Sequence, residues 1–197
     1  MKETQTKRMQ VTGALVLGAI TCCLTGQAFA GNHDPKAIVS LLKDSKISLL
    51  QGIDQAEKTS GPTTSAKFEV GDDGKLALSV YTVPEGFSAE PEKTTLTELS
   101  GDPTVTPYAP KPEEFADKEH IARASVHMTL FQLSKFTLKQ VIQKSLWRVS
   151  GQPIDVRNPM MRNKRPVADV VIAGKNGENY LVTVDLLNGR TRVAELP

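Results

Sequence analysis

This chain of 197 residues has only two cysteines, Cys22 and Cys23, and both lie within the first 30 residues. Residues 31–197 therefore have no thiol for a nucleophile, a zinc–thiolate site or a disulfide. The P-loop, the G-x-G-x-x-G fingerprint and the G-x-S-x-G nucleophile motif are missing too. We predict that the protein is not an enzyme and holds no cofactor.

An excess of charge of one sign is also missing. Three of the 24 Lys and Arg and one of the 22 Asp and Glu lie in residues 1–30, so residues 31–197 carry 21 of each. Binding to nucleic acid through phosphate contacts needs a clear excess of basic residues, and high net charge would favour disorder. The balance therefore predicts an ordinary globular protein that does not bind nucleic acid.

Residues 1–30 have the pattern of a secretory signal peptide. A basic start with Lys2, Lys7 and Arg8 is followed by an apolar stretch over 11–24 and by small residues at Ala28 and Ala30. We predict cleavage after Ala30 and a periplasmic or secreted protein.

Two other interpretations of the leader stay open. An uncleaved anchor is disfavoured because 14 residues are fewer than the roughly 20 that span a bilayer. A lipoprotein is disfavoured because Ile20 and Thr21, just before Cys22, are bulky. No later segment approaches the length of a membrane span, so we expect none after cleavage.

The chain contains an internal repeat. At an offset of 89, residues 39–53 align with 128–142, and six positions are identical: Leu41/Leu130, Ser45/Ser134, Lys46/Lys135, Leu49/Leu138, Gln51/Gln140 and Ile53/Ile142. Ser48 and Thr137 each stand three residues before a glutamine, which is a capping-box pattern. Apolar residues at helical spacing follow, so we predict helices over 49–59 and 138–149.

Hairpin patterns follow both predicted helices. Alternating apolar residues flank a turn at 71–74 in the first copy and at 175–177 in the second. A third strand is expected at 94–99 and at 191–196. The predicted fold class is α+β, with two repeats that each pack one helix on a three-stranded antiparallel sheet. Because one unit of about 70 residues is marginal alone, we expect the copies to pack together.

A proline-rich and acidic segment separates the copies. Residues 84–114 hold six of the twelve prolines and six glutamates, which is typical of an extended connector. The predicted domains are the signal peptide at 1–30, a first unit at 31–83, the connector at 84–114 and a second unit at 115–197. We expect an additional helix over 113–124.

These residues resemble the PepSY domain family. The first copy matches through 46–49, 55–58, Gly61 and 78–81, and the second through 136–138 and Tyr180–Gly189. The resemblance covers about 37–83 and 126–196, although the first copy lacks the Asp-x-x-Asn-Gly turn that the second has at 185–189. It implies an exported protein that binds or inhibits a peptidase, or modulates an envelope protein. The family has no catalytic motif to transfer.

One segment stands out as a candidate docking surface for a partner protein. Arginines and adaptable methionines gather near the predicted second hairpin, and the residues concerned are Arg157, Met160, Met161, Arg162, Lys164 and Arg165. A solvated loop between helix and strand is the alternative, with the acidic connector as a partner within the chain. The oligomeric state stays open.

The histidines and the single tryptophan give weaker indications of a functional site. His120 and His127 are seven residues apart, whereas a metal site favours i, i+4 spacing, so we expect surface histidines, as we do for His33. Trp147 follows Leu146 and is expected to pack in the core. A periplasmic module that binds a small ligand or a metal is the alternative function.

Overall fold

The computed structural model describes residues 35–71, 73–87, 90 and 94–197, so the predicted signal peptide and His33 lie outside the described residues. Within these described residues, four helices and nine strands follow one another. They are α1 (Pro35–Leu42), α2 (Leu49–Ser60), β1 (Thr63–Val70), β2 (Leu76–Thr82), β3 (Leu96–Gly101), β4 (Lys111–Phe115), α3 (Lys118–Gln132), α4 (Leu138–Leu146), β5 (Gly151–Val156), β6 (Met160–Arg162), β7 (Arg165–Gly174), β8 (Asn179–Asp185) and β9 (Thr191–Leu196).

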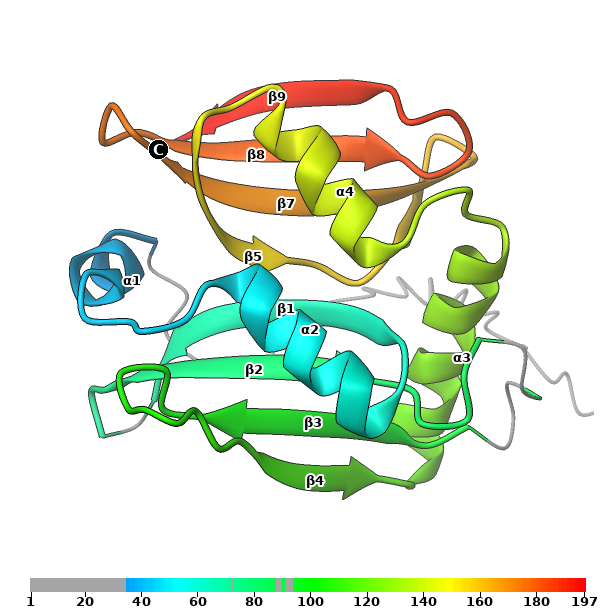
Figure 1. Cartoon of the computed structure of the whole chain (residues 1–197). Coiled ribbons are helices and arrows are strands. Elements are labelled where there is room, and N and C mark those ends of the chain that lie inside the picture. Colours follow the sequence, from blue (N-terminus) through cyan, green and yellow to red (C-terminus); the bar gives the residue numbers. More distant parts are fainter. Residues whose placement is uncertain (1–34, 72, 88–89, 91–93) are drawn as a thin grey trace, which may run out of the picture.

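The nine strands of the described residues belong to one antiparallel sheet with the order β4-β3-β2-β1-β5-β7-β8-β9, and β6 pairs with β7 beside this path (Figure 1). The two copies meet where β1 pairs with β5, through Ala66 opposite Val156 and Lys67 opposite Asp155. The predicted fold class, two helix-on-three-strand repeats, is therefore wrong. The chain forms a single large sheet, because β1, the first strand after α2, pairs with β5, the first strand after α4.

Each half of the sheet has the same order of elements. In the first half, α1 and α2 precede the meander β1-β2-β3-β4, and in the second, α3 and α4 precede β5-β7-β8-β9. The sequence pattern matches the hairpin β1–β2 with the hairpin β7–β8. In the structure the counterpart of β1 is β5, so β7–β8 corresponds to β2–β3 instead. The expected connector contributes β3 and most of β4, and the helix expected at 113–124 begins only at Lys118.

The turns between paired helices make equivalent hydrogen bonds. Ser45 Oγ donates to the carbonyl of Ile47 at 2.6 Å, and Ser134 Oγ donates to that of Phe136 at 2.7 Å. The next backbone amides reach into equivalent loops: Lys46 N donates to Pro103 O at 2.8 Å and Lys135 N to Leu186 O at 2.9 Å. The aligned Ser-Lys pair therefore has one structural role in both copies, which is to fasten the helix pair to the loop between the last two strands.

Both predicted capping boxes are confirmed. Ser48 Oγ accepts from the Gln51 amide at 3.2 Å, while the Gln51 side chain accepts from the Ser48 amide at 2.7 Å. Thr137 and Gln140 make the same reciprocal pair at 3.3 and 2.9 Å. Each box satisfies two backbone groups that a helix start leaves without partners, so the two main helices begin where the sequence indicates.

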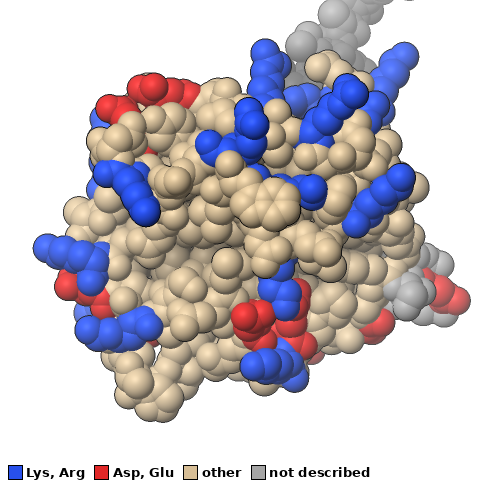
Figure 2. Space-filling view, turned by 45° about the horizontal axis from the view of Figure 1, so that its top comes forward, with Lys and Arg blue, Asp and Glu red and all other residues tan. Residues whose placement is uncertain are grey.

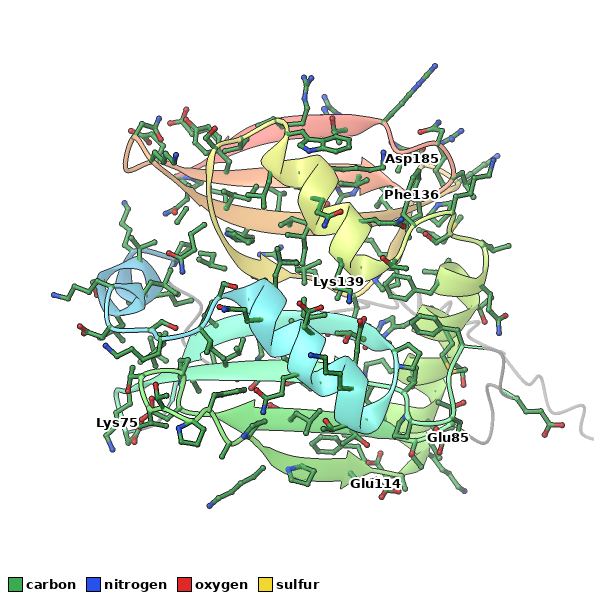
Figure 3. The ribbon with its side chains drawn as sticks, viewed as in Figure 1. Lys75, Glu85, Glu114, Phe136, Lys139 and Asp185 are labelled. Atoms are coloured by element: carbon green, nitrogen blue, oxygen red, sulfur yellow. The ribbon has the colours of Figure 1, made fainter. Side chains whose placement is uncertain are left out.

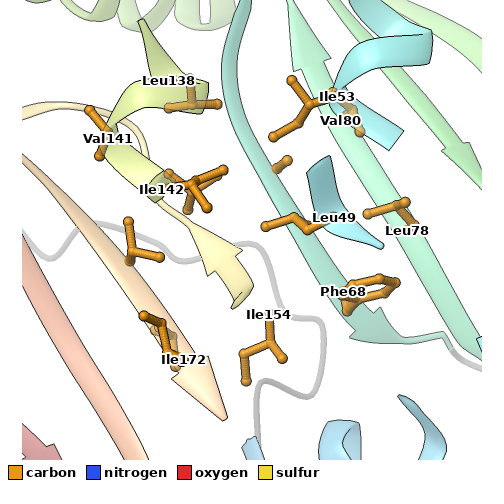
Figure 4. Packing of buried hydrophobic residues seen from close by; sticks show 14 of the residues in the cluster. Leu49, Ile53, Phe68, Leu78, Val80, Leu138, Val141, Ile142, Ile154 and Ile172 are labelled. Carbon is orange, nitrogen blue, oxygen red and sulfur yellow. The ribbon is translucent and has the colours of Figure 1, made fainter. Parts of the chain in front are cut away.

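The core lies between the sheet and the helices α2 and α4 (Figure 4). The register puts alternate residues of each strand on this face, and apolar side chains at helical spacing meet them. The buried residues labelled in Figure 4 are Leu49, Ile53, Phe68, Leu78, Val80, Leu138, Val141, Ile142, Ile154 and Ile172. Full burial of such a side chain contributes about 1.5–3 kcal/mol, so one continuous core stabilises both halves.

An ion-pair bridge joins α2 to α4. Lys139 Nζ lies 2.8 Å from Asp54 Oδ1 and 2.8 Å from Glu57 Oε2 (Figure 3). The hydrogen bond to Asp54 is the main cause that holds the pKa of Lys139 above its ordinary value, and the hydrogen bond to Glu57 adds to it. Because all three side chains are substantially exposed to solvent, the bridge fixes the relative position of the helices more than it adds stability.

Helix α3 packs at one end of the sheet, where Ala124 and Met128 join Val83 and Leu96 in a second apolar cluster. Its N-cap is Asp117, whose side chain accepts from the amides of Glu119 and His120. No helix in the described residues is long and apolar enough to cross a membrane.

Candidate binding surface

The predicted docking segment is a β-hairpin and not a solvated loop. Met160, Met161 and Arg162 pair with Val167, Pro166 and Arg165. Asn163 and Lys164 form the turn at φ of 50° and 62°, the left-handed conformation that a tight two-residue hairpin turn requires. We call residues 157–167 the basic arm, and it continues the line of β5 along β7.

The arginines of the basic arm have acidic partners close by. Arg157 Nε lies 2.9 Å from Asp155, Arg162 Nη2 lies 2.8 Å from Asp169, and Arg165 pairs with Asp185. The prediction of the acidic connector as the partner of this segment is therefore corrected, because these carboxylates come from β5, β7 and β8. The ion pairs fasten the arm to the sheet and leave less free positive charge than the sequence indicates.

Asp169 is the most deeply placed of these acids. Its side chain is 2% exposed and accepts from Thr183 Oγ1 at 2.6 Å as well as from Arg162. A buried carboxylate is costly unless it is paired and hydrogen-bonded, and both partners are present here. At Asp185, the hydrogen bond from Arg165 holds the pKa of the carboxyl below its ordinary value, and the amides of Leu187 and Asn188 add to this effect.

The two methionines remain open to solvent. Met160 is 36% exposed and Met161 is 56% exposed. Strand alternation puts them on opposite sides of the hairpin, and Met160 Sδ lies 3.5 Å from Arg162 Nη2. The basic arm thus presents Met160 beside the fixed guanidinium group of Arg162 and Met161 on its other side.

The register also shows which sheet face carries the arm. Val167 and Asp169 lie opposite Asp185 and Thr183, whereas Ala168 and Val170 point into the core beneath α4. The arginines, Met160 and their acidic partners therefore lie on the face turned away from α2 and α4. We call it the polar face.

The first half of the sheet continues the polar face with a different charge. Lys67 pairs with Glu69 at 2.6 Å, and Ser79 Oγ donates to Glu69 at 2.7 Å. Tyr81 follows, with Glu98 opposite in the ladder. Burial is the main cause that raises the pKa of Tyr81, and the negative charges of Glu98, Glu69 and Glu113 add to it. The polar face is thus acidic over β3 and β4 and basic around β6 and β7.

The histidines do not form a joint site. His120 pairs with Asp117 and stacks on Phe115 with ring centroids 4.7 Å apart. His127 is partly buried on α3, which corrects the expectation of a surface histidine, and burial, helped by Arg123, lowers its pKa to about 4. Within the described part of the chain, no group of three His, Cys, Asp or Glu side chains is placed to hold a metal ion.

Trp147 corrects another expectation, because it is 79% exposed rather than part of the core. The buried residues of α4 include Leu138, Ile142 and Ser145, and Trp147 lies about 200° around the helix from Ser145. The angular position, and not the neighbouring Leu146, was the signal that would have placed it on the surface. Lys144 Nζ lies 5.6 Å from its ring and 4.4 Å from that of Phe136.

Comparisons with known proteins add little to this geometry. No family model and no curated protein matches the chain. A solved structure that does match is that of a "putative lipoprotein" from Clostridium difficile 630, with a TM-score of 0.41 and 15% identity over 77% of this chain and 95% of that chain. A likeness of this size carries no argument about function.

Proposed function

We propose that this is an exported, non-enzymatic protein that binds a peptide or a protein of the cell envelope. Export rests on residues 1–30, with their basic start, apolar stretch and small residues before Gly31. The PepSY resemblance of the repeats supports a peptidase as the class of partner. The protein then acts in the periplasm or outside the cell, where a fold without disulfides depends on its core.

The exposed methionines of the basic arm are the observation that carries the proposal. Met160 lies beside Arg162, which Asp169 and Thr183 hold in place, and Met161 is exposed on the opposite side of the hairpin. Methionine adapts to irregular apolar surfaces, and arginine is enriched at protein interfaces. A guanidinium group that is already positioned loses less side-chain entropy when a partner binds.

The two-signed polar face supports a macromolecular partner more than a small ligand. Acidic side chains of β3 and β4 and basic side chains of the arm lie on different halves of one sheet face. A protein with the opposite arrangement of charge would match both halves at once, and such complementarity fixes orientation and excludes other partners.

The test is retention of a partner from native envelope extract by the immobilised protein. We expect a discrete partner to be retained, to be lost with the variant M160D/M161D, and to be kept with V105D, which changes an exposed residue in the β3–β4 loop. Inhibition of a peptidase from the same compartment would identify the partner class. Retention of nothing, together with no inhibition, would contradict the proposal.

A further inference from the structure

The outer edge of β9 offers unpaired backbone groups. Asp185 N donates to Arg190 O at 2.9 Å, which sets the phase of the β8–β9 ladder. Amides and carbonyls alternate in direction along a strand, so those of Thr191, Val193 and Glu195 point away from β8. Among the described strands, none pairs with β9 on this side.

The side chains along this edge separate by face. Val193 lies opposite Val182, a buried core residue beneath α4, and is itself 38% exposed. Arg192 lies opposite Thr183 and therefore points to the polar face, as does Arg190. The edge thus has an apolar side chain towards α4 and two exposed arginines towards the opposite face.

Trp147 extends the apolar side. Gly189, just before β9, lies beside Lys144 and Phe136, so this side of α4 faces the β8–β9 turn. Trp147 is one helical turn further on, and the C-terminal end of α4 is directed towards β9 (Figure 1). Figure 2, in which the top of Figure 1 is turned forward, shows Lys and Arg side chains distributed around an uncharged area.

The other edge of the sheet is less suited to pairing. Strand β4 has Pro112, which lacks an amide, and the adjacent acids Glu113 and Glu114. On β9, Glu195 is the only acid, and no residue lacks an amide. Of the two edge strands, β9 is therefore better suited than β4 to pair with a further strand.

We propose that β9 binds an extended segment of a partner protein in which acidic and apolar residues alternate, and that this segment joins the sheet as an additional strand. The backbone of Thr191, Val193 and Glu195 would exchange hydrogen bonds with the segment, as in other cases of strand addition. Its apolar side chains would lie against Val193 and Trp147, and its carboxylates would meet Arg190 and Arg192. The period of two in the segment matches the two faces of the edge.

A second copy of the chain fits the edge less well. Antiparallel pairing of two β9 strands in this phase would put Val193 opposite Val193 and bring Arg192 of both copies into diagonal positions on one face. Like charges at such positions destabilise a strand pair. This site is separate from the basic arm, so the inference does not depend on the proposed function.

The experiment uses the fluorescence of Trp147, the only tryptophan of the chain. The purified protein is titrated with a short capped peptide of alternating glutamate and valine, and separately with the matched lysine–valine peptide. We expect a saturable blue shift with the first peptide and none with the second, because burial of the indole shifts its emission.

Variants separate the backbone contribution from the charge. V193P removes an outward amide without breaking the β8–β9 ladder, and we expect at least about tenfold weaker binding, whereas V193A keeps the amide and should bind within about threefold of the original chain. R190E/R192E should reverse the preference towards the lysine–valine peptide. Circular dichroism of each variant verifies its fold.

Three results of the peptide titrations would overturn the inference. They are the absence of a saturable shift with the glutamate–valine peptide, equal binding of both peptides, and unchanged binding by a folded V193P variant. Concentration-dependent dimers that V193P abolishes would also overturn it, because they would show that a second copy covers this edge. Loss of the envelope partner in M160D/M161D tests the basic arm separately and leaves these results unaffected.

Discussion

The Asp169 carboxylate, 2% exposed, accepts a hydrogen bond from Arg162 Nη2 at 2.8 Å. Asp169 belongs to β7 and Arg162 to β6, so this ion pair fixes the basic arm to the sheet. Arg162, one of the six predicted docking residues, therefore also has a structural role.

Removal of Arg162 should destabilise the protein because it leaves Asp169 buried and unpaired. We expect R162A to lower the free energy of unfolding by about 2–3 kcal/mol in urea titrations. The matched control is R157A, whose partner Asp155 is 22% exposed, and its cost should stay below about 1 kcal/mol. Equal costs for both variants would show that the burial of Asp169 does not matter.

The two capping boxes should contribute equally, since their hydrogen bonds are matched. S48A and T137A are each expected to cost about 1 kcal/mol of folding free energy, measured by thermal and urea unfolding. The control S40A changes a hydroxyl within α1 that donates to the carbonyl of Ala37, and it should lie within about 0.5 kcal/mol of the original chain. A loss of folding free energy in only one of the two variants would contradict the equivalence of the two capping boxes.

His127 should make stability depend on acidity. Its pKa is about 4 in the folded chain and about 6.5 in the unfolded chain, so between these values the unfolded state binds more protons. Stability is therefore fully present above about pH 6.5 and falls as the pH decreases towards 4, by at most about 3 kcal/mol. H127L should flatten this part of the stability curve, and an unchanged slope would assign the effect to other groups.

Local signals in the sequence predict the two main helices and the hairpins around Gly71–Gly74 and Lys175–Gly177, because capping and turn residues act within a few positions. Strand β4 gives no such signal, since an exposed edge strand needs no apolar alternation, and β5 begins with Gly151 and contains Pro153. The pairing of β1 with β5 is non-local. This one strand pairing joins the two predicted small sheets into a single sheet.

The candidate surface was predicted only in part. The composition of 157–165 indicates the exposed methionines, but the partners Asp169 and Asp185 belong to strands whose register no local pattern defines. The exposure of Trp147 follows from its angle around α4, which adjacency to Leu146 conceals. Strand edges such as that of β9 become visible only once the order of the sheet is known.

Site-specific photo-crosslinking in living cells tests the central claim most directly. A photoreactive residue is placed at position 161, which is 56% exposed on the basic arm, or at position 105, which is 49% exposed in the β3–β4 loop. The account predicts a discrete adduct with one envelope protein from position 161 and none from position 105. An absence of adducts at position 161, or the same adducts from both positions, would contradict it.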